Sequence, residues 1–379
     1  MVEVLIAGAG PAGAIAALVL ARAGVRVLIV DRAKFPRDKI CGDTLNPGAM
    51  RILERYGLRA RVDPRGFPIH GMLLTGPTGV QVRGLYGSGI IGRSLIRRDF
   101  DQMLIEAAVA AGAQFQDGVR VQGPILEQAS GSKSPSVHGA MLVSRDGRTL
   151  RIPAQMTIAA DGRRSTLAFA LGLARQPARP RRWAIGGYFQ EVDGLDIVGE
   201  MHIRRGHYIG VAPLPGGVVN ACYVSASREG MAQPAAQLLR ALWRDPLLRE
   251  RFVRARITGP VTVLGPMAVD VPRAGVRGLL LAGDAAGFID PITGDGVRLA
   301  MRGGELAAEA ALASLEHPDR AWHETLTRRR AEAFSNKHRF NRLIRTVVAS
   351  EHAVRAGAIS ASLAPALMRR IISYAGDIA

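Results

Sequence analysis

A cluster of glycines between two strand-like runs constrains the fold more than any other feature of this chain. Residues 4–7 are apolar and rich in strand-forming side chains, and they lead into Gly8-Ala9-Gly10-Pro11-Ala12-Gly13. Small and apolar residues then recur at helical spacing as far as Gly24, a second strand-like run covers residues 25–30, and Asp31 follows it. The segment therefore predicts a strand, a glycine-rich turn, a helix and a second strand in one unit.

Each glycine of this turn has a physical reason to be there. Gly8 permits a tight turn, Gly10 lets a phosphate approach the backbone, and Gly13 lets the helix pack closely on the strand. Free N–H groups at the helix start attract phosphates, and Asp31 is placed to accept hydrogen bonds from a ribose diol. We therefore expect a dinucleotide site here, rather than a glycine-rich turn without a ligand. Its candidate contacts are Gly8, Gly10, Pro11, Ala12, Gly13, Asp31 and Arg32.

A second glycine cluster lies far downstream. The apolar residues 279–282 end in Gly283-Asp284, and an irregular stretch then leads to Gly294 and Gly296, ahead of a helix expected from about Val297. Asp284 is placed to bind a ribityl hydroxyl. The N–H groups at Gly294 and Gly296 would face the part of an isoalloxazine ring that gains negative charge on reduction. This arrangement favours FAD over a nicotinamide cofactor as the bound dinucleotide.

Three segments together resemble a known flavoprotein fold. The two glycine motifs and residues 160–165 (Ala-Asp-Gly-Arg-Arg-Ser) look like the fingerprints of the fold typified by p-hydroxybenzoate hydroxylase. Within that fold, Lys39-Ile40-Cys41-Gly42-Asp43 and residues 291–296 most resemble the geranylgeranyl reductase family. The resemblance covers residues 1 to about 330. It implies an α/β protein with a Rossmann-like FAD-binding domain, an inserted antiparallel β-sheet substrate domain and a C-terminal helical segment.

The resemblance also implies roles for individual residues. Arg98 resembles an arginine that touches the FAD pyrophosphate region, with Arg97 left as the alternative. Asp161 resembles a residue that supports both FAD and a transient nicotinamide cofactor. Cys41 and Asp43 are the candidate catalytic residues, although Cys41 also fits the description of a small buried hydrophobe. The further candidate cofactor contacts are Cys41, Gly42, Arg98, Asp161, Gly162, Gly283, Asp284, Pro291, Gly294, Asp295 and Gly296.

No metal site is expected, because His202 and His207 lie five residues apart without further ligands near them. Strand-like segments follow the first and middle motifs, and in the resembled fold such segments form a sheet that roofs the flavin. We therefore expect three parts. The FAD-binding domain comprises residues 1–65, 95–174 and 260–330, the substrate domain 66–94 and 175–259, and C-terminal helices 331–379. Residues 129–136 read as a surface hairpin loop.

The formal net charge of +18 suggests an anionic partner, but 46 of the 50 basic residues are arginines spread through the chain. Zinc-finger spacing is missing and aromatic residues make up only 5%, so a nucleic-acid partner is not expected. Residues 12–21, the longest apolar stretch, are too few to span a bilayer. We expect a cytoplasmic protein. Its basic helical segment after Pro318 either packs on its own domain, which we favour, or contacts a membrane surface at the cytoplasmic face.

The expected activity is that of an FAD-dependent oxidoreductase. NADPH or NADH would reduce the flavin, which would then reduce isoprenoid-type C=C bonds of an apolar small molecule. The alternative is a flavin monooxygenase that hydroxylates an aromatic or polyketide substrate. A flavin halogenase ranks low, because residues 49–130 hold no lysine and the WxWxIP signature is missing. A non-enzymatic basic binding protein also ranks low. Substrate, electron donor and oligomeric state are left open.

Overall fold

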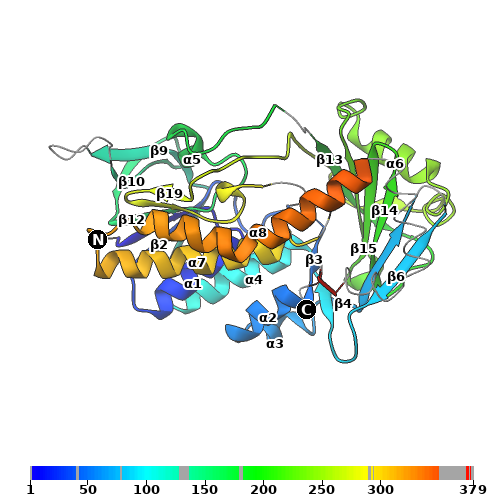
Figure 1. Ribbon diagram of the computed structural model, residues 1–379, viewed down its shortest axis with the longest axis horizontal. Coiled ribbons are helices and arrows are strands. Elements are labelled where there is room, and N and C mark those ends of the chain that lie inside the picture. The colour runs from blue at the N-terminus through cyan, green and yellow to red at the C-terminus, as the bar shows by residue number, and fades with distance from the viewer. Residues whose placement is uncertain are drawn as a thin grey trace.

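Two large sheets lie at opposite ends of the molecule, joined by long helices and a small linking sheet (Figure 1). The computed structural model describes residues 2–39, 42–76, 79–127, 136–178, 182–288, 292, 294–349, 373–374 and 376.

The first sheet has the strand order β19-β20-β12-β1-β2-β8. Its strands run parallel, except that β19 is antiparallel to β20. Apolar, β-branched runs such as that of β1 suit a sheet that is covered on both faces. The strands are β1 (Val4–Ala7), β2 (Val27–Asp31), β8 (Gln114–Asp117), β12 (Met156–Ala159), β19 (Gly275–Val276) and β20 (Leu279–Leu281).

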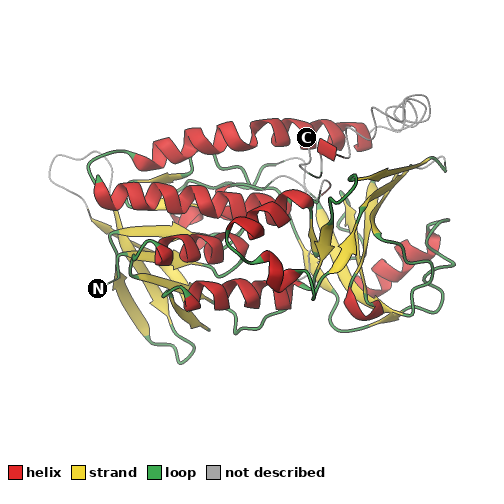
Figure 2. Ribbon diagram, turned by 90° about the horizontal axis from the view of Figure 1, so that it is seen from below, coloured by secondary structure: helices red, strands yellow, loops and turns green. Residues whose placement is uncertain are grey.

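Alternate residues of β1 point to two different apolar cores. Val4 and Ile6 are buried against the helices on one face, whereas Leu5 and Ala7 are buried against a three-stranded sheet on the other. Figure 2 shows the covering helices running side by side. They are α1 (Pro11–Arg22), α4 (Arg97–Ala110), α7 (Gly296–Glu316) and α8 (Trp322–Ala349). The opposite face is covered by β9 (Arg120–Glu127), β10 (Ser136–Val143), β11 (Thr149–Pro153) and α5 (Thr166–Ala170).

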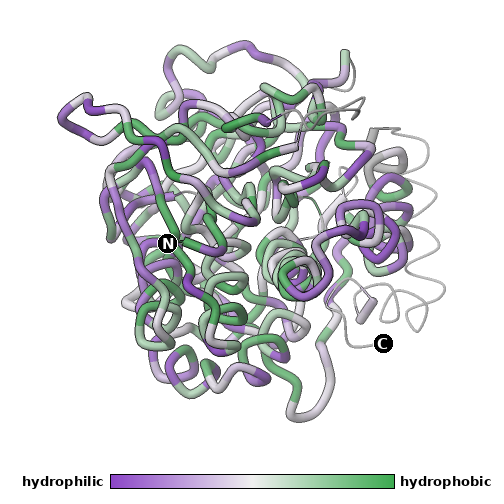
Figure 3. The backbone as a smooth tube through the Cα atoms, turned by 90° about the vertical axis from the view of Figure 1, so that its left-hand side faces the viewer, coloured by the Kyte–Doolittle hydropathy of each residue, from purple (hydrophilic) through white to green (hydrophobic). Residues whose placement is uncertain are grey.

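Helix α8 packs its apolar side on its own domain, as we favoured. Leu326 and Phe334 are buried in the core that also contains α1 and α7. In Figure 3, α7 is largely green and α8 beside it largely purple, which fits an outer helix over an inner one. Helix α8 runs unbroken through the expected boundary between residues 330 and 331. No helix within the described ranges is long and apolar enough to cross a membrane.

The second large sheet, which we call the roof sheet, has the order β17-β13-β16-β15-β14-β5-β6, with β18 also paired to β13. Its pairs are antiparallel as expected, except that β5 runs parallel to β14. The exception arises because β5 and β6 come from a separate, earlier part of the chain. Its strands are β5 (Gly71–Thr75), β6 (Gln81–Leu85), β13 (Trp183–Gln190), β14 (Val198–Arg204), β15 (His207–Pro213), β16 (Val219–Ser225), β17 (Arg256–Ile257) and β18 (Thr262–Leu264). Helix α6 (Pro234–Arg244) covers one face of this sheet.

A small sheet links the two ends of the molecule, with strand β7 between β3 and β4. Strands β9 and β10 pair antiparallel on either side of the expected surface loop, and residues 129–135 of that loop lie outside the described ranges. The remaining elements are β3 (Thr44–Leu45), α2 (Pro47–Arg55), α3 (Arg59–Val62), β4 (Phe67–Ile69), β7 (Gly92–Ser94) and the 3₁₀ turns η1 (Pro215–Gly217) and η2 (Gly283–Ala286).

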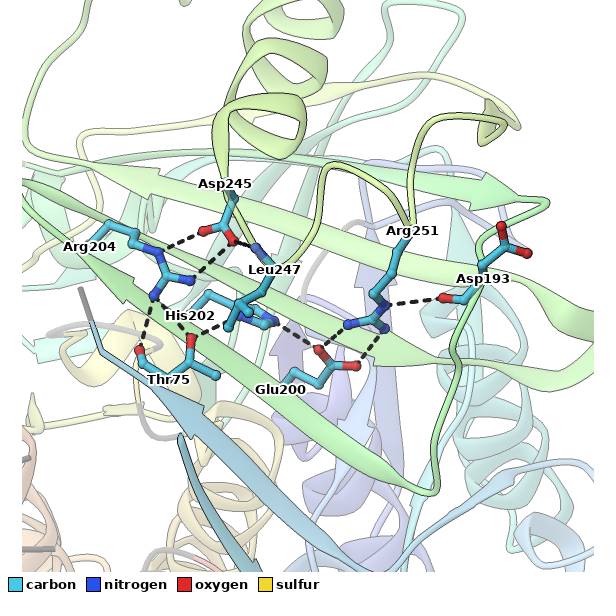
Figure 4. Close-up of polar contacts among 8 residues, drawn as sticks. All are labelled: Thr75, Asp193, Glu200, His202, Arg204, Asp245, Leu247 and Arg251. Carbon is cyan, nitrogen blue, oxygen red and sulfur yellow. Dashed lines mark hydrogen bonds and ion pairs between the residues drawn. The ribbon is translucent and has the colours of Figure 1, made fainter. Parts of the chain in front are cut away.

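A row of polar side chains, most of them charged, follows β14 on the roof-sheet face that α6 covers (Figure 4). Glu200 accepts hydrogen bonds from both terminal nitrogens of Arg251, at 2.7 and 2.8 Å, and its Oε2 lies 2.8 Å from His202 Nε2. Burial raises the pKa of Glu200, but hydrogen bonds from Arg251 and His202 outweigh it and hold this pKa below its usual value. The buried carboxylate is therefore stabilised mainly by one arginine. The polar row comprises Thr75, Asp193, Glu200, His202, Arg204, Asp245 and Arg251.

The backbones of helices α1 and α7 are in direct contact at Gly304, with no side chain between them. A Cβ at Gly304 would lie 2.2 Å from the carbonyl oxygen of Ala12, far inside van der Waals contact. We expect Gly304→Ala to lower the free energy of unfolding by about 3 kcal/mol, because backbone cannot yield as a flexible side chain would. Urea denaturation measures the loss. Gly123→Ala is the control, since a Cβ there has no described residue within 4 Å. Equal stability of the two variants would contradict the predicted clash.

Removal of Arg251 should be costly for a different reason. Arg251→Met leaves the Glu200 carboxylate, whose side chain is 3% exposed, without its guanidinium partner. We expect a loss of roughly 3–5 kcal/mol of unfolding free energy, because an uncompensated charge stays buried. Arg254→Met breaks an ion pair whose side chains are 71% and 51% exposed, and should cost under about 1 kcal/mol. If both variants denature at the same urea concentration, the buried row is not stabilising.

Candidate active site

The glycine-rich turn joins β1 to α1 and is held by Asp31. Gly8 has a φ of 101°, and a Cβ there would lie 2.4 Å from the carbonyl oxygen of Ala160. Asp31 Oδ2 accepts a hydrogen bond from Ala9 N at 2.9 Å, and Oδ1 accepts one from Ala33 N at 2.9 Å. Backbone N–H groups thus fix the carboxylate from two sides. Each oxygen keeps lone-pair capacity for a ribose hydroxyl.

The start of α1 is suited to an anion. Pro11 occupies the first turn, which contains no acidic residue, and Gly10 caps it without a side-chain hydrogen bond. A Cβ at Gly13 would lie 1.9 Å from the carbonyl oxygen of Gly8, so helix and turn touch through backbone alone. The positive end of the helix dipole and the free N–H groups therefore point toward the turn.

Arg37 lies over this turn, although sequence analysis did not identify it as a site residue. Its Nη2 is 3.6 Å from the position of a Cβ on Gly10 and 2.9 Å from Asp101 Oδ2, and its Nε is 4.0 Å from Asp31 Oδ2. The side chain is only 13% exposed. Arg37 therefore places a guanidinium where a pyrophosphate would meet the turn. Its acidic partner lies 64 residues away in the sequence, so no local signal marked it.

The neighbouring arginines of α4 have different environments. Arg97 is buried, and its Nε and Nη2 donate to Asp101 at 2.7 and 2.8 Å. Arg98, the expected cofactor contact, has a side chain that is 50% exposed, 3.9 Å from the exposed Asp38. Lys39 interacts electrostatically with Arg97, Arg37, Asp101 and Asp284. The structure thus brings Arg97, and not Arg98, into the cationic cluster near the turn.

The middle motif lies directly against the first. Asp161 Oδ2 accepts a hydrogen bond from Thr166 N at 2.9 Å, whereas Oδ1 is buried without a hydrogen-bond partner among the described residues. Burial raises the pKa of Asp161 above its ordinary value. Arg32 acts on this carboxyl electrostatically, and Gly162 turns the chain with a φ of 83°. The Ser165 side chain also hydrogen-bonds this carboxyl, and Oδ1 keeps the capacity to accept from a ligand.

The downstream motif completes the same cluster. Gly283 has a φ of 57°, and a Cβ there would lie 2.9 Å from the Cβ of Ala12 on α1. Asp284 follows it and interacts electrostatically with Lys39 and with Arg163 of the middle motif. Among the described residues, none would lie within 4 Å of a Cβ placed on Gly42, Gly294 or Gly296.

Asp295 has a structural partner that the sequence did not reveal. Its Oδ1 accepts a hydrogen bond from Asn46 Nδ2 at 2.7 Å, and its Oδ2 lies 3.8 Å from Lys337 Nζ. Asn46 Oδ1 also accepts from Ala49 N at 2.9 Å and so caps α2. Asp295 thus ties together the starts of α2 and α7 and the middle of α8. Cys41 and Pro291 lie outside the described residues.

Asp43 stands between the cofactor motifs and the roof sheet. It is 1% exposed and adopts a φ of 49°, which Asp tolerates better than most residues. Its Oδ2 accepts a hydrogen bond from Asn220 Nδ2 at 2.6 Å, its Oδ1 accepts one from Arg97 N at 3.2 Å, and Tyr188 also hydrogen-bonds its side chain. Burial raises the pKa of Asp43 to about 7, although all of these partners lower it. Both protonation states are therefore accessible near neutral pH.

These features fit FAD. The backbone cradle at Gly8 and Gly13 and the acid at Asp31 match the groups that bind an adenine dinucleotide. The guanidinium of Arg37 adds a positive charge for its phosphates. When bound, FAD supplies hydride-transfer chemistry.

The cationic cluster generates a test of cofactor binding. We expect Arg37→Gln to weaken FAD binding about tenfold, because a charge-assisted contact to the pyrophosphate is lost. Arg98→Gln, on an exposed neighbouring side chain, should leave the dissociation constant within about twofold. Quenching of flavin fluorescence on titration of apoprotein measures both. A larger effect at Arg98 than at Arg37 would reverse this assignment.

Comparison with known proteins agrees with this geometry. A family model described as the FAD binding domain matches residues 1–337. The menaquinone reductase of Mycolicibacterium smegmatis is 30% identical over 354 residues, covering 90% of this chain and 84% of the relative. The digeranylgeranylglycerophospholipid reductase of Methanosarcina mazei is 30% identical over 330 residues, covering 84% and 76%.

A solved structure of a flavoprotein/dehydrogenase from Cytophaga hutchinsonii has the same fold. It matches with a TM-score of 0.85 at 20% identity, and the match covers 99% of this chain and 92% of that one. The expected α/β flavoprotein fold is thereby confirmed. By motifs, family model and relatives, the chain belongs to the geranylgeranyl reductase family of FAD-dependent oxidoreductases.

Proposed function

We propose that this protein reduces an isoprenoid-type C=C bond of an apolar substrate, with NADPH or NADH as the electron donor. The observation that carries the proposal is Asp43, a buried carboxyl with a pKa of about 7 between the cofactor motifs and the roof sheet. Saturating a double bond requires one hydride and one proton. Hydride chemistry belongs to the cofactor, so the protein itself must hold a proton donor.

Asp43 meets the requirements for that donor. Near neutral pH a large fraction of its carboxyl groups is protonated, and the proton passes to the alkene carbon that does not receive the hydride. The carboxylate left behind is stabilised by Asn220 Nδ2 and by the backbone N–H of Arg97. Solvent then restores the proton. We also propose Cys41, in the same segment, as a second catalytic candidate.

The roof sheet offers a surface for an apolar chain. Gly186, Cys222 and Gly210 are directly opposed across β13, β16 and β15, and a Cβ at Gly210 would meet only ordinary contacts. A neighbouring row on the same face is apolar and packs with residues of the downstream motif and of α8. Small side chains next to an apolar row suit a slender hydrocarbon chain. The apolar residues of that cluster include Ala184, Met201, Tyr208, Val224, Met267 and Ile292.

The relatives support this substrate class. One is named as a reductase of menaquinone and the other as a reductase of a digeranylgeranylglycerophospholipid, and both molecules carry isoprenoid chains. For a cytoplasmic protein with such a substrate, we propose peripheral membrane contact through the exposed side of α8. Arg328, Arg339, Arg342 and Leu343 are exposed there.

One experiment separates the reductase from the monooxygenase. The purified yellow protein is supplied with NADPH or NADH and with menaquinone, a digeranylgeranyl phospholipid or a phenol, while O2 uptake and product mass are followed. A gain of two hydrogens without O2 uptake supports the reductase. A gain of one oxygen atom that requires O2 supports the monooxygenase and overturns the proposal.

Asp43→Asn should abolish most turnover while leaving cofactor reduction intact. Because the amide is nearly isosteric but is not an acid, we expect turnover to fall roughly 10²–10⁴-fold. NADPH-driven bleaching of the flavin should proceed at the wild-type rate. In wild type, turnover should decline as pH rises through about 7, since Asp43 must be protonated to donate.

The exposed residue Asp38 provides the matched control, and Asp38→Asn should keep wild-type turnover and pH dependence. FAD content and thermal midpoint are recorded for both variants. Full turnover in a well-folded Asp43→Asn enzyme would remove Asp43 from the mechanism.

A further inference from the structure

Two roof-sheet side chains converge on Asp43 from neighbouring strands. Tyr188 on β13 and Asn220 on β16 are directly opposed in the antiparallel ladder, so their side chains leave the same face of the sheet. Both hydrogen-bond the Asp43 side chain, with Asn220 Nδ2 at 2.6 Å from Oδ2. Asn220 is 177 residues away from Asp43 in the sequence. The contact therefore joins the cofactor segment to the sheet that faces it.

The orientation of the Asn220 amide is set by a further contact. Cys222 Sγ donates to Asn220 Oδ1 at 3.1 Å, two residues along the same face of β16. With its oxygen accepting from the thiol, the amide presents Nδ2 to Asp43, and an NH₂ group can only donate. The backbone N–H of Arg97, at Oδ1, can only donate as well.

Tyr188 differs from these two partners in one respect. Its hydroxyl can donate a hydrogen bond and can also accept one, whereas the Asn220 amide nitrogen and the Arg97 N–H cannot accept. When Asp43 is protonated, its proton therefore has one acceptor among these three partners. Tyr188 is also only half-buried, while Asp43 is 1% exposed. The tyrosine hydroxyl is thus the more accessible end of the pair.

We propose that Tyr188 relays the proton of Asp43 to the substrate, and that Asn220 is a positioning residue that directs this proton toward Tyr188. The proposal rests on the reductase function proposed above. The Asp43 O–H bond breaks as its proton joins the tyrosine oxygen, and the original tyrosine proton forms the new C–H bond. The hydride adds to the other alkene carbon, so the substrate gains H₂ and Asp43 is left as a carboxylate.

The electrostatic surroundings give the relay a measurable signature. Burial raises the pKa of Asp43, whereas the Tyr188 and Asn220 hydrogen bonds and the charge of Arg97, itself paired to Asp101, lower it. Removing the Tyr188 hydroxyl should therefore raise this pKa further. The carboxyl band of Asp43, identified by infrared difference against Asp43→Asn, should titrate at higher pH in Tyr188→Phe than in wild type. This readout needs neither substrate nor turnover.

The kinetic test uses the holoenzyme with menaquinone and with a digeranylgeranyl phospholipid. We expect Tyr188→Phe to lower turnover about 10²-fold and to change the solvent deuterium isotope effect, because one of two proton transfers is lost. Asn220→Leu should move the infrared titration in the same direction with a smaller loss of turnover. Tyr223→Phe is the control, since Tyr223 lies on β16 but packs on the α6 side. FAD content and thermal midpoint verify folding.

The outcomes separate the two proposals. If Asp43→Asn is inactive while Tyr188→Phe keeps wild-type turnover and isotope effect, the relay is wrong and the reductase proposal stands. If Asp43→Asn is fully active, Asp43 is not the proton donor and the relay is wrong. If neither lipid gains hydrogen, the reductase proposal itself fails. An unmoved infrared titration in Tyr188→Phe would show that the hydroxyl does not act on Asp43, and would also overturn the relay. A loss of turnover in Tyr188→Phe without any change in isotope effect would indicate a structural role only.

Discussion

The structure depends on the close contact of uncovered backbone around the first helix. Gly8 and Gly13 bring the turn against the middle motif and against itself, and Gly304 brings α7 onto Ala12 at a distance that no side chain would permit. Gly283 of the downstream motif also lies close to Ala12. These contacts place three segments, far apart in sequence, around one dinucleotide-sized turn. The candidate cofactor-binding groups depend on these backbone contacts, because the groups lie at the ends of the helices and strands that the contacts join.

Asp43 provides the second connection, between the cofactor side and the roof sheet. Its partners come from the start of α4 and from two roof strands, so a change in the packing of either part reaches the same carboxyl. A buried acid held by three donors is a demanding arrangement, and it makes the position of the roof sheet part of the chemistry rather than only a cover. Two arginines also have an internal role, because Arg97 and Arg251 are paired with the buried carboxylates of Asp101 and Glu200.

How far the sequence could predict this structure depends on the range of each interaction. The first unit was predictable because its signals are local: the expected strand at residues 4–7 coincides with β1, and the second strand lies within two residues of β2. The pairing of Arg97 was also open to prediction, since only Arg97, and not Arg98, has an acid four residues later on the helix. The partners of Asp43 were not, because Asn220 and Tyr188 become its neighbours only through the tertiary fold. Arg37 was not predicted as a site residue for the same reason.

The strand order of the parallel sheet also governs when this protein can become functional during its synthesis. In the sheet, β1 lies between β2 and β12. Strand β2 is synthesised soon after β1, β12 much later, and β20 later still. The backbone contact on Ala12 waits for Gly304. The side of the nascent β1–α1–β2 unit that packs on α7 therefore stays uncovered until most of the polypeptide has emerged. Contacts between such distant segments close slowly, because a long loop must be ordered before they form.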